Sequence, residues 1–154
     1  MNHFSDLGIS IIKTDHPPVF TVEEARALRG EIPGAHCKNL FLKDKKGVLW
    51  LVVCLEEARV DLKSLPDKIG SARISFGSAE LLREVLGVEP GSVTPFALVN
   101  DGKLRVRIVL QREMMEYEQV NYHPLVNTST ITLSPSDLLV FIASCGHEPI
   151  IVSM

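Results

Sequence analysis

The 154-residue sequence has only three cysteines, one tryptophan and 6% aromatic residues, and it contains no long apolar run. Its longest apolar stretches, such as 48–55 and 138–143, fall well short of the ~20 residues that span a bilayer. Cys37, Cys54 and Cys145 are odd in number and widely spaced, so they predict free thiols in a reducing compartment. No basic leader followed by an apolar segment is present. We therefore expect a cytoplasmic protein without a membrane segment.

The chain also lacks an excess of basic charge. Sixteen Lys and Arg stand against nineteen Asp and Glu, for a formal net charge of -3. This balance argues against a protein that coats nucleic acid electrostatically, although it permits recognition of one local RNA feature. With 45% hydrophobic and 23% charged residues, and a length close to the ~150 residues of one domain, the chain predicts a single folded domain over 1–154.

The pattern of apolar and turn-forming residues predicts strands and helices in irregular alternation. Strands are expected at 8–13, 38–43, 48–55, 72–76, 96–99, 104–110, 128–133 and 149–152, and helices at 21–29, 61–69, 78–86 and from Ser134 to before Gly146. Two pairs of strands read as hairpins, 38–43 with 48–55 and 96–99 with 104–110, and strand 48–55 reads as buried on both faces. We predict an α+β fold, a mixed sheet with helices packed on it.

Nucleotide-binding and metal-binding signatures are missing. The sequence has no GxGxxG after a strand, no Walker loop, no CxxC, no HExxH and no GxSxG. A zinc site could be assembled from His36, Cys37, His123, Cys145 and His147, but these residues form no compact pair of ligands. We therefore expect no metal and no cofactor.

Cys37 is a candidate nucleophile because its neighbours His36 and Lys38 could lower the pKa of its thiol. Adjacent residues of a strand point to opposite faces, however, so neither neighbour is placed to contact the sulfur. We interpret the cysteines as small apolar residues, and a cysteine hydrolase that uses Cys37 stays an alternative.

Lys38 is the most informative polar residue, because in its predicted strand it shares a face with Leu40 and Leu42. Either its stem lies along the sheet with the ammonium in water, or the charge has a function. Loop 91–95, with Gly91 first and Pro95 last, could turn backbone amides toward a ligand, and loop 121–127 holds His123 before a proline. A plain surface turn and a solvated histidine are the simpler interpretations of these loops.

The order of these features resembles the YbaK-type aminoacyl-tRNA editing domains, which include the insertion domain of bacterial prolyl-tRNA synthetases and its freestanding relatives. The signature segments are 38–42, 91–96 and 121–127. Segments 16–25, 75–78 and 146–149 narrow the resemblance to the freestanding ProX subgroup, which deacylates alanyl-tRNA(Pro). The resemblance runs from about residue 7 to the end of the chain. It implies one editing domain over 1–154, with a mixed sheet or partly closed barrel surrounded by helices.

The resemblance implies catalytic roles for Lys38, Gly91 and His123. Lys38 would contact the terminal adenosine or the aminoacyl oxygens and stabilise negative charge, backbone amides near Gly91 would position the ester, and His123 would shape the pocket. An aminoacyl ester is already activated, so its hydrolysis needs an oriented water and a stabilised oxyanion rather than a side-chain nucleophile.

Substrate-binding and RNA-binding residues are implied in the same way. Asn39, Leu28, Leu40, Leu42 and Pro95 are expected at the substrate, where the leucines either form a wall that excludes proline or belong to the ordinary core. Expected phosphate contacts, or else a solvated face, are Arg26, Arg29, Lys43, Lys45 and Lys46. The expected partner is the acceptor end of tRNA(Pro), with prolyl-tRNA synthetase as a second candidate and with neither DNA nor membrane.

Besides the cysteine hydrolase, two alternatives to an alanyl-tRNA(Pro) deacylase remain open. Within the family, the substrate could be another small aminoacyl ester, cysteinyl- or seryl-tRNA. In a different class, the same fold could be a non-catalytic module that binds tRNA or a synthetase, in which Lys38 only grips RNA.

Overall fold

The computed structural model describes residues 8, 11–15, 35–88, 93–122 and 129–153. Within these ranges the elements are β1 (Ile12–Asp15), β2 (Ala35–Asp44), β3 (Leu49–Leu55), α3 (Leu65–Ile69), β4 (Ile74–Phe76), α4 (Ala79–Leu86), η1 (Pro95–Asn100), β5 (Val106–Gln111), η2 (Glu113–Glu116), β6 (Val120–Tyr122), β7 (Ser129–Leu133), α5 (Pro135–Ser144) and β8 (Ile150–Val152).

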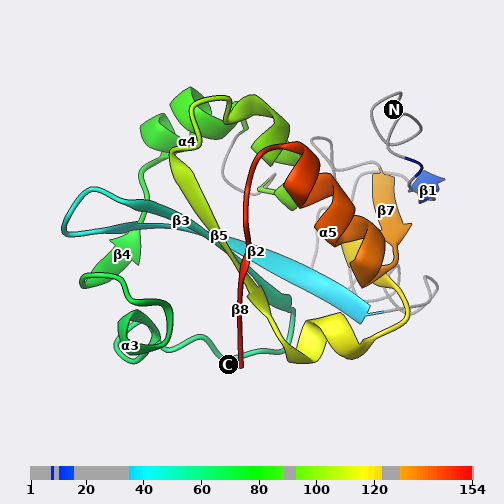
Figure 1. The fold of residues 1–154 in the computed structure, drawn as a ribbon, viewed down its shortest axis with the longest axis horizontal. Helices are drawn as coiled ribbons and strands as arrows, with labels where there is room; N and C mark the ends of the chain where they lie inside the picture. Colours follow the sequence, from blue (N-terminus) through cyan, green and yellow to red (C-terminus); the bar gives the residue numbers. More distant parts are fainter. Residues whose placement is uncertain (1–7, 9–10, 16–34, 89–92, 123–128, 154) are drawn as a thin grey trace.

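The described strands form one mixed eight-stranded sheet in the order β1-β7-β6-β2-β3-β5-β8, with β4 paired to β2 outside this path. β2 pairs with β3 and β4 in antiparallel orientation and with β6 in parallel, and β5 is parallel to both β3 and β8. β1 and β7 lie at the end of the molecule opposite β4 (Figure 1). The predicted mixed sheet with packed helices is therefore confirmed.

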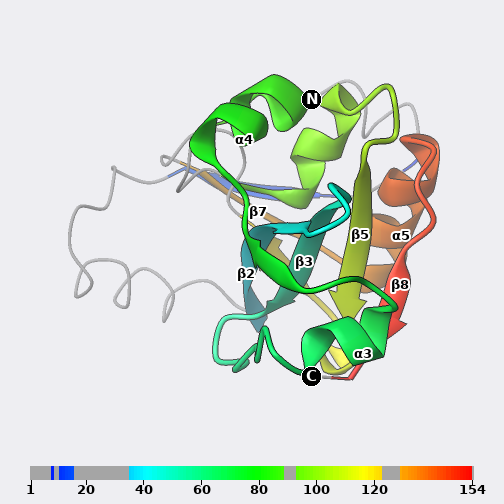
Figure 2. The same cartoon turned by 90° about the vertical axis from the view of Figure 1, so that its left-hand side faces the viewer.

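Helices cover both faces of the sheet. Figure 2 shows α4 and α3 on opposite sides, with β2, β3 and β5 between them. The larger apolar cluster packs one face against α4, η1 and α5, and the smaller cluster packs the other face against α3. Because successive residues of β3 alternate between these two clusters, β3 is buried on both faces, as predicted.

The second predicted hairpin, 96–99 with 104–110, is wrong. Residues 95–100 form the 3₁₀ helix η1, because the Thr94 hydroxyl accepts a hydrogen bond from the Phe96 amide at 3.4 Å and Pro95 fits the first helical turn. The Asp101 carboxylate then accepts hydrogen bonds from the amides of Arg105 and Val106, at 2.9 and 2.8 Å. These bonds turn the chain into β5, which joins β3 and β8 in parallel.

Other predicted boundaries differ by smaller amounts. The helix expected at 61–69 begins only at Leu65, since Pro66 lacks an amide hydrogen and fits only the first turn. The first described strand is Ile12–Asp15, which overlaps the predicted strand 8–13, of which residues 9 and 10 lie outside the described ranges. β6 (Val120–Tyr122) was not predicted, and it includes the first two residues of the predicted loop 121–127. The helix predicted at 21–29 lies outside the described residues. None of the helices in the described ranges has the length and apolar content needed to cross a bilayer.

The buried carboxylate of Asp44 fixes the turn between β2 and β3. Its Oδ1 accepts the amides of Lys46 and Val48 at 2.9 Å each. Its Oδ2 accepts Trp50 Nε1 at 3.3 Å and the amide of Ala72 at 3.4 Å. Burial by itself would raise the pKa of Asp44, but these four hydrogen bonds outweigh it and hold the pKa below its ordinary value of 3.8. One side chain thus joins the hairpin to the segment that leads into β4.

We expect Asp44→Asn to lower the free energy of unfolding by roughly 1.5–3 kcal/mol, because an amide cannot accept all four hydrogen bonds. Since folding lowers the pKa of Asp44, its stabilising contribution is present above pH 3.8 and is lost as the pH falls through the folded-state pKa. Denaturant unfolding of wild type and variant between pH 3 and 7 measures both effects. Glu57→Gln, at an exposed carboxylate, is the control. Equal stability of Asp44→Asn and wild type at pH 7 would contradict this role.

Candidate functional site

β2 changes its partner along the edge that faces away from β3. Its first two residues, Ala35 and His36, pair with β6, and its last three, Leu42–Asp44, pair with β4. Between these two ladders no described strand pairs with β2, and the amide of Gly77 donates to the carbonyl of Phe41 at 2.9 Å. Among the residues that the structure describes, the sheet is therefore interrupted beside the middle of β2. We call this interruption the β2 gap.

The backbone of Asn39 points into the β2 gap. The amide of Glu56 donates to the carbonyl of His36, and the amide of Asp44 donates to the carbonyl of Val48, each at 2.9 Å. Along a strand, the backbone N–H and C=O groups of successive residues point alternately to one neighbouring strand and the other. These two bonds therefore show that the even-numbered residues of β2 are hydrogen-bonded to β3. Residue 39 is odd-numbered, so its N–H and C=O groups point away from β3, between β6 and β4.

The side chain of Asn39 ties β2 to the loop before η1. Its Nδ2 donates to the carbonyl of Val93 at 3.1 Å. Its Oδ1 is buried and has no hydrogen-bond partner within the part of the chain that the structure describes. Buried acceptors are nearly always paired, so an unpaired one marks a place where a donor can bind.

A pocket of about 180 Å³ opens next to Asn39. It lies where β2 meets the junction of β4 and α4, and it is mainly apolar; its lining residues are Asn39, Leu40, Phe41, Phe76, Gly77, Ala79, Leu82 and Val93. Gly77 is required there by close approach, because a Cβ at this position would lie 2.4 Å from Cδ2 of Phe41. The aromatic ring and the glycine backbone together form one wall of the pocket.

Lys38 lies on the opposite face of β2 from Asn39, on the same face as Leu40 and Leu42, as the strand pattern predicted. The side chain is half-buried, and its Nζ donates to the carbonyl of Ala58 at 2.6 Å. Lys38 does not line the pocket at Asn39, but Leu40, two residues along the same face, does. The ammonium is thus held at a defined position on the apolar face beside the pocket.

The other predicted site residues separate into three groups. Leu42 is 0% exposed within the cluster around α3, so it belongs to the core and lines no accessible pocket, and Pro95 is buried at the start of η1. The side chains of Lys43, Lys45 and Lys46 are exposed along the hairpin. The residues that lie outside the described ranges are Gly91, His123, Leu28, Arg26 and Arg29.

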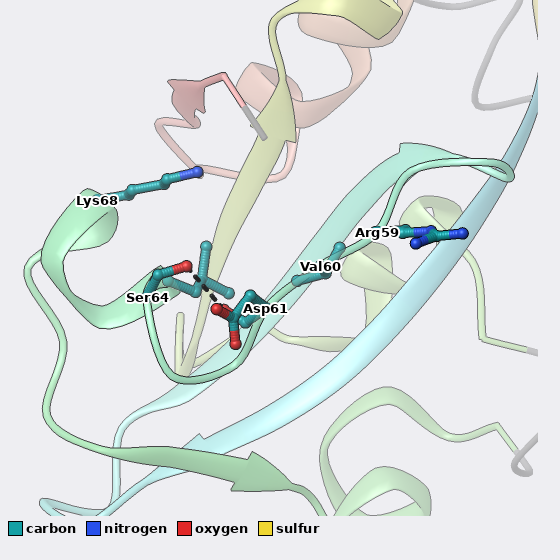
Figure 3. A pocket seen from close by; sticks show the side chains of 6 residues that line it. Arg59, Val60, Asp61, Ser64 and Lys68 are labelled. Carbon is teal, nitrogen blue, oxygen red and sulfur yellow. Dashed lines mark hydrogen bonds between the residues drawn. The ribbon is translucent and has the colours of Figure 1, made fainter.

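A second, smaller cavity lies beside α3 and holds about 40 Å³. Figure 3 shows Ser64 turned toward Asp61 and the guanidinium of Arg59 directed away from both. The hydroxyl of Ser64 donates to the backbone carbonyl of Asp61 at 3.3 Å, so it is already used within the loop. This volume has room for ordered water but not for a substrate.

Cys37 and the zinc candidates find no support in the described structure. Burial raises the pKa of the Cys37 thiol to about 12, and its hydrogen bonds with Tyr122 and the backbone of Asn121 offset this only in part. His147 Nε2 lies 3.4 Å from a carboxylate oxygen of Asp101. Across the ranges that the structure describes, no three His, Cys, Asp or Glu side chains are grouped to hold a metal ion. Burial and the raised pKa of Cys37 argue against a thiolate nucleophile at this position.

Comparison with known proteins defines the class. The model of the aminoacyl-tRNA editing domain family matches residues 16–141, so the chain belongs to this family. A Xenopus laevis relative, prolyl-tRNA synthetase associated domain-containing protein 1, is 39% identical over 97% of this chain and 92% of its own. The prolyl-tRNA editing protein ProX of Acetoanaerobium sticklandii is 36% identical over 92% of this chain and 87% of its own. The family predicted from the ordered sequence segments is confirmed.

Solved structures show the same fold at lower identity. The crystal structure of a hypothetical protein superposes with a TM-score of 0.78 at 21% identity, over 99% of this chain and 95% of the other. A structure described as a proposed trans-editing enzyme for prolyl tRNA synthetase superposes with a TM-score of 0.68 at 19% identity, over 94% and 87% of the two chains.

The predicted site residues include Asn39 and Leu40 but omit the six others that line the pocket: Phe41, Phe76, Gly77, Ala79, Leu82 and Val93. Phe76 and Gly77 stand in the segment that narrowed the family resemblance, but local sequence does not show that Gly77 meets Phe41 across β2. Val93 stands inside the predicted loop 91–95, and only the tertiary structure shows its carbonyl on Asn39.

We expect Cys37 to react slowly with iodoacetamide at pH 8 in the native protein, because its pKa of about 12 leaves almost no thiolate and its side chain is buried. Peptide mapping after labelling measures the reaction at each cysteine. Cys145, which is less buried, is the internal control, and the unfolded protein should label at all three positions. Labelling of native Cys37 as fast as of unfolded Cys37 would revive the cysteine-hydrolase alternative.

Proposed function

We propose that this protein is a trans-editing deacylase that hydrolyses the ester of mischarged tRNA(Pro), with alanyl-tRNA(Pro) as its substrate. We also propose that residues 1–154 form a single editing domain that acts in the cytoplasm on the acceptor end of tRNA(Pro) and binds prolyl-tRNA synthetase. Membership of the aminoacyl-tRNA editing domain family and the similarity to ProX support this proposal. The observation that carries it is the β2 gap, where Asn39 reaches the loop that follows Gly91 and where Lys38 lies on the same strand.

The first requirement for ester hydrolysis is a fixed site for developing negative charge. Lys38 supplies a cation whose Nζ is anchored on the carbonyl of Ala58, so little side-chain entropy is lost when a substrate binds. The backbone N–H of Asn39 adds a donor that faces the β2 gap, where none of the described strands pairs with it. In this proposal Lys38 stabilises the oxyanion or holds the terminal adenosine, and backbone amides near Gly91 position the ester.

The second requirement is an attacking water. The attack of water breaks the bond between the acyl carbon and the ribose oxygen, and it releases the free amino acid and the tRNA with its terminal hydroxyl restored. The neighbouring ribose hydroxyl orients the water, so no side-chain nucleophile is needed. This route suits a site in which burial keeps the Cys37 thiol protonated. His123 shapes the pocket in this proposal and is not the obligatory base.

Selectivity in this proposal requires a site that rejects proline. A synthetase site built for proline rejects the smaller alanine weakly, because a missing methylene is worth only ~1–3 kcal/mol. A second site that excludes proline by size supplies the remaining discrimination. The apolar pocket of about 180 Å³ has room for a small side chain, but its volume alone does not exclude a five-membered ring, so we propose that the shape of its wall, to which we assign Leu40, Phe41 and Leu82, rejects proline. Leu42 is excluded from this assignment by its burial.

RNA contacts are proposed at the exposed end of the hairpin. Lys43, Lys45 and Lys46 are exposed there, and the amide of Lys45 donates to the carbonyl of Arg73 at 3.0 Å, which brings a fourth basic side chain to the same end. A few local phosphate contacts are compatible with a chain whose formal net charge is -3.

The first experiment measures deacylation of alanyl-, prolyl- and cysteinyl-tRNA(Pro) by catalytic amounts of wild type and of Lys38→Ala. We expect rapid loss of the alanyl ester alone, and a fall in kcat/KM of about 100- to 1,000-fold in Lys38→Ala, the effect of removing one oxyanion donor. Lys63→Ala, at an exposed lysine near α3, is the matched control and should retain activity. Circular dichroism establishes that Lys38→Ala is folded.

The outcomes separate the alternatives. Preferred loss of the cysteinyl ester would replace the alanyl assignment, and seryl-tRNA is the next substrate to assay in that case. Survival of every ester under wild type, with tRNA binding intact, would overturn the enzyme in favour of a non-catalytic RNA-binding module. Full activity of a folded Lys38→Ala would remove the catalytic role of Lys38.

A further inference from the structure

Phe76 is a solvent-exposed aromatic residue at the rim of the pocket next to Asn39. Its side chain is 65% exposed, the largest value among the large hydrophobic residues that the structure describes. Single exposed apolar residues are common and need no explanation by themselves. Phe76 differs because it ends β4, lines the pocket at Asn39, and precedes the glycine that packs on Phe41.

The strand register places Phe76 on the same face of the sheet as Lys38. Phe76 pairs with Leu42, and directly opposed residues of an antiparallel pair project from one face. Lys38, Leu40 and Leu42 share that face, with Leu40 in the middle at the pocket. The backbone positions of Lys38 and Leu42 are four residues apart, or about 13 Å along the strand. A single nucleoside that lies over Leu40 can therefore reach from the ring of Phe76 toward the ammonium of Lys38.

The charge around Phe76 favours an anionic occupant over an apolar one. Lys43 pairs with Ser75, the residue before Phe76, and Lys45 is bonded through its backbone to Arg73. Lys43, Lys45 and Arg73 are all exposed. A hydrophobic protein partner that docked on Phe76 would remove these cations from water, which costs free energy. Single-stranded nucleic acid offers phosphates for the cations and flat bases for the aromatic ring.

We propose that Phe76 is a stacking platform for the terminal base of the aminoacyl-tRNA. The base stacks on the exposed ring, the ribose lies over Leu40, and the ester is delivered toward Lys38 and the β2 gap. Stacking tolerates any base, because every base has a π-face, so Phe76 positions the acceptor end without reading sequence. This inference rests on the proposed deacylase function and adds to it a binding residue for the RNA end.

The test compares Phe76→Leu and Phe76→Tyr with wild type on two substrates: alanyl esters of a short RNA that ends either in adenosine or in an abasic ribose. Base stacking on one aromatic ring corresponds to about 5- to 150-fold in affinity or kcat/KM. We expect wild type to lose activity in this range on the abasic substrate. On the adenosine substrate, Phe76→Leu should be slower than wild type by a similar factor. On the abasic substrate, Phe76→Leu should be nearly as active as wild type. Phe76→Tyr keeps the ring and should resemble wild type.

Two controls keep the result interpretable. Tyr117→Leu removes another exposed aromatic ring, 49% exposed and absent from the pocket lining, and it should change neither substrate. Fluorescence anisotropy with the two unacylated RNAs measures binding independently of turnover. Since the Phe76 side chain is largely solvated, Phe76→Leu should unfold at the same denaturant concentration as wild type.

The readouts distinguish failure of this inference from failure of the proposed function. If binding depends on both Phe76 and the terminal base but no ester is hydrolysed, the platform stands and the deacylase proposal fails. If the ester is hydrolysed but Phe76→Leu equals wild type on both RNAs, the platform is overturned. The platform is also overturned if the fold-loss in kcat/KM from Phe76→Leu is the same on the adenosine and abasic substrates. The ring and the base would then act independently.

Discussion

The change of partner along β2 is the constraint on which the site depends. β2 keeps a continuous antiparallel ladder with β3 along one edge, while its other edge passes from β6 to β4. Neither short strand reaches residue 39, which leaves backbone donors and acceptors facing the β2 gap at a fixed position. Asp44 stabilises one end of this arrangement, because its carboxylate joins the hairpin turn to the segment that leads into β4.

The β2 gap also explains how neighbouring residues can serve one ligand. Lys38 and Asn39 point to opposite faces of the sheet, and in an unbroken sheet one small molecule cannot touch both. Where the sheet is interrupted, a ligand can pass the edge of β2 and meet both faces. In the proposed site, a lysine followed by an asparagine on a central strand can serve one ligand because, among the described strands, neither β4 nor β6 pairs with the middle of this edge of β2.

Much of the fold could be predicted from the sequence because its signals are local. The β2–β3 hairpin, α4 and α5 follow from turn chemistry and periodicity, and the structure confirms them and shows the Ser78 and Ser134 hydroxyls capping the two helices. The error at 96–99 arose because an apolar run has the same appearance in a strand and in a 3₁₀ helix, while the Thr94 cap and Pro95 decide between them. The face of Lys38 followed from strand alternation. Three contacts could not be predicted from the strand pattern, because each joins residues that are distant in sequence. They are the hydrogen bond from Lys38 to Ala58, the hydrogen bond from Asn39 to Val93, and the close approach of Gly77 to Phe41.

The most direct test of the β2 gap as the aminoacyl site is a titration of the ¹⁵N-labelled protein with 3′-alanylamido-3′-deoxyadenosine, an amide-linked analogue that cannot be hydrolysed as an ester. Chemical shifts report each backbone amide separately. The largest changes are predicted at the amides of Asn39, Phe76 and Gly77, which border the β2 gap and its pocket. A separate pocket of about 370 Å³, whose lining includes Glu84 and Arg105, should be unaffected. Changes confined to the pocket at Glu84 and Arg105, with Asn39 unmoved, would contradict the account.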